Sequence, residues 1–190
     1  MPNTLSKIFL PAAQLKSRHY PKAPRLRLKS LRKDKRKNGN KKVLILGVGN
    51  RLRGDDAIGC LIADELKKED GVSVIDCGTT PENFIDKVCS LNPNQVLIVD
   101  ACDFKAEPGQ FKIFPESEIE KIEQNLISTH TLPLSLSVAL IKKQVDGQIQ
   151  LLGVQPGNLN FSGELSPQLK KAKDRIVKYI KDLIKKNERR

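Results

Sequence analysis

Short apolar runs alternate with longer amphipathic segments from Lys42 to the end of the 190-residue chain. Five of these runs are rich in Val, Ile and Leu and have the length of buried strands: residues 43–49, 72–77, 95–102, 110–114 and 148–154. Strands that are separated by helical segments are typical of a sheet covered by helices on both faces. The pattern therefore predicts an α/β fold with a five-stranded sheet.

Four helices are predicted between and after these strands, because apolar residues recur there at helical spacing. Their expected starts are the Asp55-Asp56 pair, Thr80-Pro81, the residues after Thr131, and Ser166-Pro167. The fourth strand follows the third after only a short turn, so we expect it to run antiparallel. Together these elements predict a three-layer α/β/α sandwich with a mostly parallel sheet, in one domain of residues 41–190.

Residues 1–40 carry almost all of the net charge. They hold 12 Lys and Arg against one acid, Asp34, and so supply +11 of the chain's +12. Like charges, prolines and few clustered apolar residues predict a disordered basic tail. We interpret it as a solvated extension or the product of an upstream start codon. Attachment to RNA, a membrane or an acidic partner, or an import sequence, are the alternatives, and nucleic-acid binding is expected only through this tail.

The remaining composition favours a cytoplasmic protein without membrane insertion. No apolar run approaches the roughly 20 residues needed to span a bilayer. Each of the four cysteines lies in or beside an apolar run, and none forms a C-x-x-C pair: Cys60, Cys77, Cys89 and Cys102. Buried thiols in a reducing compartment are the simplest interpretation.

The loop after the first strand carries the first candidate chemistry. Gly47-Val48-Gly49 resembles a dinucleotide-binding turn, but Leu52 stands where the third glycine of that motif belongs. Asp55 and Asp56 follow, and two carboxylates oppose an anion at this position. The pair favours a cation instead of a phosphate.

Other candidate ligands are expected at the same edge of the sheet, where open α/β sheets build their sites. Asp100 ends the third strand and Asp103 follows it, although a carboxylate there could simply cap backbone N–H groups. His130 is the only histidine outside the tail. An Asp/Asp/His set suits a borderline divalent ion such as nickel or zinc. A Ser-His-Asp triad stays open, but the chain has no G-x-S-x-G motif.

Five ordered blocks carry a resemblance to a known family: "LGVGNRLRGDDAIG", "VIDCGTTPEN", "LIVDACD", "STHTLPLSL" and "LGVQP". Over residues 42 to about 185 the chain resembles the hydrogenase maturation endopeptidases, most closely the type that processes the large subunit of hydrogenase 3. The resemblance implies a phosphorylase/hydrolase-like α/β/α fold and removal of a C-terminal peptide from the nickel-loaded large-subunit precursor of a [NiFe] hydrogenase. It also implies that Asp56, Asp100 and His130 contact nickel that the precursor supplies.

Some features depart from that family or leave alternatives. Cys77 stands where the family commonly has glycine, and Arg51 and Arg53 add positive charge that either steers an acidic substrate or solvates the turn. Nickel could serve for recognition, or also polarise the scissile carbonyl or a water. A carboxylate general base is equally open. A non-proteolytic nickel-binding chaperone and a nucleotide-binding α/β domain are the competing hypotheses.

Overall fold

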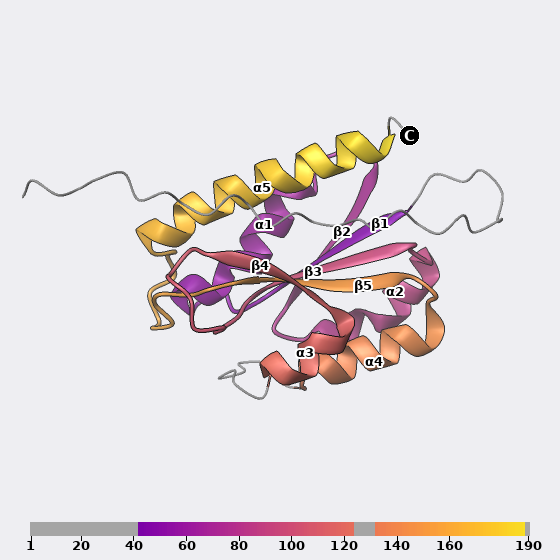
Figure 1. Ribbon diagram of the computed structural model, residues 1–190, viewed down its shortest axis with the longest axis horizontal. Coiled ribbons are helices and arrows are strands. Elements are labelled where there is room, and N and C mark those ends of the chain that lie inside the picture. Colours follow the sequence, from indigo (N-terminus) through magenta and orange to yellow (C-terminus); the bar gives the residue numbers. More distant parts are fainter. Residues whose placement is uncertain (1–41, 124–131, 189–190) are drawn as a thin grey trace, which may run out of the picture.

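The computed structural model describes residues 42–123 and 132–188, and it contains the predicted five-stranded sheet (Figure 1). The strands are β1 (Val43–Val48), β2 (Val72–Gly78), β3 (Gln95–Ala101), β4 (Phe111–Pro115) and β5 (Gln148–Val154). Their order across the sheet is β2-β1-β3-β5-β4. All neighbours are parallel except β4, which pairs with β5 in the antiparallel sense. The predicted strands and the direction of the fourth are confirmed.

The helices also begin close to their predicted starts. They are η1 (Gly54–Ala57), α1 (Ile58–Leu66), η2 (Pro81–Phe84), α2 (Ile85–Leu91), α3 (Glu116–Glu123), α4 (Leu134–Gln144) and α5 (Pro167–Glu188). The sequence reasoning missed α3. This helix is only two turns long and mostly charged, and Ile119 and Ile122 are its only apolar residues, so it has too short an apolar stripe to be recognised. The basic tail, residues 1–40, lies outside the described residues.

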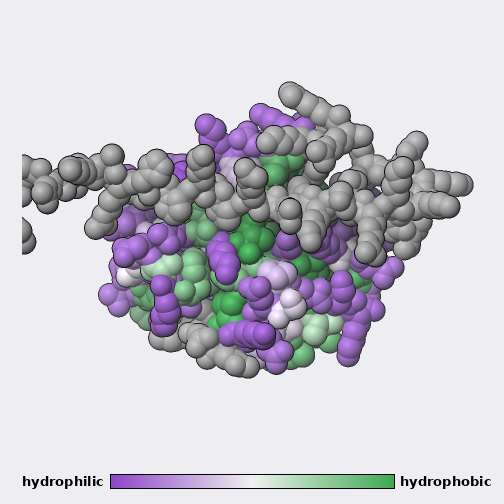
Figure 2. Space-filling view, in the orientation of Figure 1, coloured by the Kyte–Doolittle hydropathy of each residue, from purple (hydrophilic) through white to green (hydrophobic). Residues whose placement is uncertain are grey.

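Two separate cores hold the helices against the sheet. Successive residues of β1 point to opposite faces, so Leu44 and Leu46 enter one core and Ile45 enters the other. Helices α2, α3 and α4 cover the first face, and α1 and α5 cover the second (Figure 1). In the same view, Figure 2 shows hydrophilic side chains around the margin of the molecule and hydrophobic surface between the helical layers. The predicted three-layer sandwich is confirmed.

Helix α1 packs on the sheet at unusually short range. A Cβ atom at Gly59 would lie 2.2 Å from the carbonyl oxygens of both Val48 and Val99, and one at Gly47 would lie 2.3 Å from the Gly59 oxygen. The close packing that the third glycine gives to a dinucleotide-binding turn is therefore supplied here by Gly59. This contact brings the start of α1 directly over β1 and β3.

The carboxyl ends of β1 and β3 form the point where the chain changes direction across the sheet. From β1 the chain moves outward to β2, whereas from β3 it moves toward β4 and β5 on the other side. Loops on the two sides separate at such a point, and α/β proteins commonly bind ligands there. Within the described ranges, no helix has the length and apolarity to cross a bilayer.

Candidate active site

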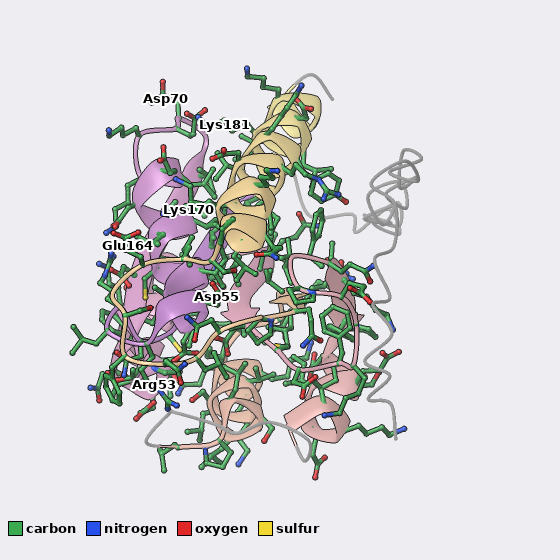
Figure 3. The ribbon with its side chains drawn as sticks, turned by 90° about the vertical axis from the view of Figure 1, so that its left-hand side faces the viewer. Arg53, Asp55, Asp70, Glu164, Lys170 and Lys181 are labelled. Carbon is green, nitrogen blue, oxygen red and sulfur yellow. The ribbon has the colours of Figure 1, made fainter. Side chains whose placement is uncertain are left out.

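The two adjacent acids of the first loop have different surroundings. Asp55 is fully buried in η1. Its Oδ2 accepts hydrogen bonds from the N–H groups of Gly157 (2.8 Å) and Asn158 (2.7 Å) and from the Ser166 hydroxyl (2.9 Å), while Oδ1 accepts from the Ser166 N–H (2.6 Å). Figure 3 shows Asp55 at the first turn of α5. The prediction that both acids serve a cation is therefore wrong for Asp55, because this carboxylate ties η1 to the loop before α5.

Asp56 is also buried, but its backbone packs against a different part of the chain, Gly49. A Cβ atom at Gly49 would lie 1.8 Å from the Asp56 carbonyl oxygen, and the φ of Gly49 is 145°. Only glycine fits this approach. The result is that η1 folds back onto the end of β1 and holds Asp56 at the carboxyl edge of the sheet.

Asp100 occupies the next-to-last position of β3 and is almost completely buried. Its Oδ1 accepts a hydrogen bond from the Ala101 N–H at 2.8 Å, so the capping role considered from sequence is part of its function. Because β3 contacts η1, Asp56 and Asp100 lie on adjoining elements at one edge. His130 lies outside the described residues, and among those described no three His, Cys, Asp or Glu side chains form a metal-binding group. The three-ligand set stays a prediction.

The backbone N–H groups of the glycine turn are already used within the protein. Gly49 donates to the Gly78 carbonyl (2.9 Å), Asp55 to the Asn158 carbonyl (2.8 Å), and Asp56 to the Arg53 carbonyl (3.0 Å). A phosphate-binding turn needs such groups to point at the ligand. The nucleotide-binding alternative therefore finds no support in this turn.

Arg51 joins three elements beside the turn. Its Nη2 lies 2.5 Å from Asp76 Oδ2 on β2 and 2.8 Å from Asp64 Oδ2 on α1. Burial raises the pKa of Asp76, but hydrogen bonds from the Arg51 guanidinium and the Gly78 N–H lower it by more, so the pKa lies below its usual value. Arg51 therefore holds the first loop in place, which favours a structural interpretation of its charge over substrate steering.

The buried cysteines of this region are held as neutral thiols. The Cys60 thiol donates to the Gly49 carbonyl at 3.3 Å, and its pKa is raised by burial and by Asp76. Burial, with a smaller contribution from Asp76, raises the pKa of Cys77 to about 12. A cysteine nucleophile needs a lowered pKa, so neither thiol is activated. Cys102 is buried, Cys89 is half-buried, and none of the four described cysteines forms a disulfide.

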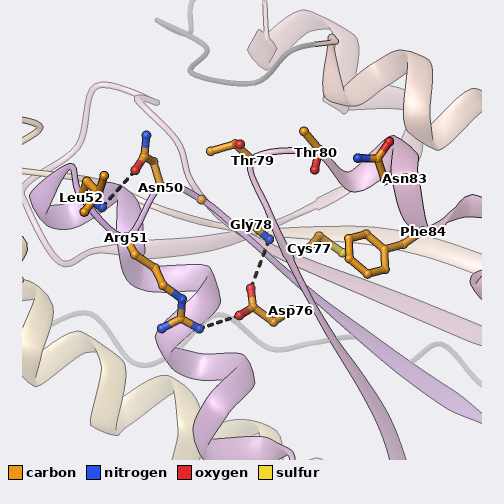
Figure 4. Close-up of a pocket in the computed structure, with 11 residues that line it drawn as sticks. Asn50, Arg51, Leu52, Asp76, Cys77, Gly78, Thr79, Thr80, Asn83 and Phe84 are labelled. Atoms are coloured by element: carbon orange, nitrogen blue, oxygen red, sulfur yellow. Dashed lines mark hydrogen bonds and ion pairs between the residues drawn. The ribbon is translucent and has the colours of Figure 1, made fainter.

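A pocket of about 450 Å³ lies between the loops that follow β1 and β2 (Figure 4). Its polar lining includes Asn50, Thr79, Thr80 and Asn83, and its apolar lining includes Leu52, Cys77 and Phe84. The pocket therefore presents amide and hydroxyl groups that can form hydrogen bonds beside apolar side chains. Sequence reasoning missed this pocket, although the block "CGTTPEN" supplies most of one wall.

The sequence reasoning also missed Gln155, which lies just after β5. Its side chain explains the structural role of Asp103. Its Oε1 accepts hydrogen bonds from the N–H groups of Phe104 (2.9 Å) and Ala106 (3.1 Å), and its Nε2 donates to Asp103 Oδ1 at 3.2 Å. Asp103 also pairs with Lys105 at 2.7 Å. The Asp103 carboxylate therefore shapes the loop after β3.

A family model for hydrogenase maturation proteases matches residues 59–183, well over half of the chain. The chain belongs to the hydrogenase maturation protease family. The protease is 32% identical to the hydrogenase 3 maturation protease of Escherichia coli K12 over 139 residues, which cover 72% of this chain and 87% of the relative.

Solved structures agree with this assignment. The protease is similar to the [NiFe] hydrogenase maturation protease HycI from Thermococcus kodakarensis KOD1, with a TM-score of 0.69, 35% identity and coverage of 78% of this chain and 95% of that one. It is also similar to the hydrogenase maturating endopeptidase HybD from Escherichia coli, with a TM-score of 0.66, 26% identity and coverage of 76% and 93%. The predicted family, fold class and peptidase activity are confirmed.

Proposed function

We propose that this protease removes a C-terminal peptide from the nickel-loaded large-subunit precursor of a [NiFe] hydrogenase, and that Asp56, Asp100 and His130 contact the precursor's nickel. The observation that carries the proposal is the pair of buried acids, Asp56 on η1 and Asp100 on β3, on adjoining elements at the edge where the chain changes direction. The relatives' names support the substrate class, since they refer to hydrogenase 3 and to [NiFe] hydrogenase maturation.

The chemistry of these side chains supports a metal that arrives with the substrate. Two carboxylates and one imidazole are ligands that a borderline divalent ion accepts. Such a set is open and binds such an ion less tightly than the histidine-rich sites of metallohydrolases. A precursor that already holds nickel through its own ligands would complete the coordination, so docking depends on loading. Nickel then acts as the recognition point that brings the scissile bond to the protease.

Cleavage of loaded and metal-free precursor tests this proposal. The purified protease is incubated with each form, and the mass of the precursor is followed by mass spectrometry. We expect the loaded form alone to lose a C-terminal peptide. D56N, D100N and H130Q should stop the cleavage, whereas D103N should retain it, because Asp103 is engaged by Lys105 and Gln155.

Two results would overturn separate parts of the proposal. Equal cleavage of the metal-free precursor would show that nickel is not recognised. Normal cleavage by all three variants would show that other residues contact the metal. A chaperone that binds the loaded precursor without cutting it would leave the mass unchanged, but the family assignment favours the peptidase.

A further inference from the structure

Large hydrophobic side chains are exposed at only three positions of the described chain. Leu52 is 67% exposed, Phe161 is 79% exposed and Leu136 is 43% exposed. Leu52 follows β1, Phe161 lies in the loop after β5, and Leu136 is in the first turn of α4. Single exposed apolar residues are common on protein surfaces. Leu52 and Phe161, however, both lie in loops at the carboxyl edge, beside the candidate active site.

The loops that carry Leu52 and Phe161 are packed against each other. The Arg53 guanidinium lies 5.6 Å from the centre of the Phe161 ring, and its Nε donates to the Leu159 carbonyl at 3.2 Å. At Gly54 a Cβ atom would lie 2.7 Å from the Asn158 oxygen. These contacts support Phe161 from one side and leave most of its ring in solvent, so the exposed ring belongs to an ordered surface.

Leu52 also connects this surface to the pocket. It lines the pocket together with Thr79 and Thr80 from the loop after β2 and Phe84 of η2 (Figure 4). Leu52 and Phe84 therefore both line the pocket, and Arg53, the residue after Leu52, contacts the ring of Phe161. We call Leu52 and Phe161 the loop surface.

We propose that the loop surface binds an apolar segment of the hydrogenase large-subunit precursor next to its metal, so that Leu52 and Phe161 set the affinity for this substrate. The inference rests on the proposed function. The position of the two residues supports it, because Leu52 lines the pocket, Arg53 joins its loop to that of Phe161, and both loops lie at the carboxyl edge with Asp56 and Asp100. A second copy of the chain at this place would cover the edge that the precursor must reach.

Steady-state kinetics with nickel-loaded precursor test the loop surface. L52S and F161S should each raise KM about fivefold to tenfold, because each removes an apolar contact made equally in the bound and transition states. The double variant should raise KM by the product of the two, with kcat within about twofold of wild type. F161L, which keeps apolar area, should recover most of the affinity. K178S, an exposed change on α5, serves as the unaffected control.

Thermal unfolding and sedimentation complete the test. Both side chains are largely exposed, so the serine variants should unfold at the wild-type temperature. An unchanged KM in the double variant would overturn the inference, as would a loss confined to kcat. A concentration-dependent dimer that L52S and F161S abolish would identify a second copy as the occupant, and would also overturn it. Failure of the wild-type protein to cut loaded precursor would count against the proposed function instead.

Discussion

Replacing Asp55 by asparagine gives the sharpest stability prediction for this fold. The carboxylate is fully buried and accepts four hydrogen bonds, three at Oδ2 and one at Oδ1. An asparagine oxygen can replace Oδ2, but its NH₂ group then faces the Ser166 N–H, which approaches Oδ1 to 2.6 Å. The other orientation points NH₂ at three donors. Either way two donors oppose each other inside the protein.

The size of the stability loss follows from the lost hydrogen bond and from the buried donors that are left without an acceptor. A hydrogen bond to a charged group contributes about 1.5–3 kcal/mol, and an unsatisfied buried group costs about 1–3 kcal/mol. We therefore expect D55N to lower the free energy of unfolding by about 2–4 kcal/mol. D55A leaves four donors without this acceptor and should cost about 3–5 kcal/mol.

Urea unfolding followed by circular dichroism measures these differences. The midpoint should fall while the slope with denaturant stays constant, because the fold itself is unchanged. D103N is the matched control, since Asp103 is partly exposed and pairs with Lys105; it should change stability by less than about 1 kcal/mol. A D55N protein as stable as D103N would refute the assignment of Asp55 to the loop before α5.

Three further predictions concern packing, thiols and acid stability. G59A should lower the free energy of unfolding by more than about 3 kcal/mol, because its Cβ would lie 2.2 Å from two strand carbonyls, and chemical denaturation measures it. In the native protein near pH 8, a thiol reagent should react rapidly with Cys89 alone, whereas all four cysteines should react after unfolding in guanidinium. The lowered pKa of Asp76 contributes stability above its unfolded pKa of about 3.9 and loses it as pH falls through the lower folded pKa. R51M removes one cause of that lowering, so its acid unfolding should begin at a higher pH in a circular dichroism titration.

The positions of the strands could be predicted from the sequence because their apolar runs are continuous and bounded by turns. Val96, Ile98 and Val99, for example, are buried on both faces of β3 as such a run predicts. Helix α3 lacked this signal, since it places only two apolar residues on the core. The close packing at Gly59 could not be predicted from the sequence either, because the short distance depends on how α1 crosses β1 and β3.

The candidate site was predictable only in part, for a reason that Asp55 and Asp56 illustrate. The two residues are adjacent and chemically identical, so no pattern distinguishes them. Their roles differ because Gly157, Asn158 and Ser166, about a hundred residues later, provide donors to Asp55. The resemblance to a family selected Asp56, and the geometry explains why Asp55 is committed elsewhere. His130 stays a prediction from sequence.

The hydrogen bonds of Asp55 mean that the residues just before α5 hold η1, and with it Asp56, in position at the candidate active site. Shortening the chain before Ser166, or redesigning residues 157–166, would release η1 even though every candidate metal ligand were left intact. Loss of activity in such variants would then report a displaced η1, which is about a hundred residues away in sequence but in direct contact in the fold. An engineer who grafts this site onto another scaffold would have to transplant both segments together.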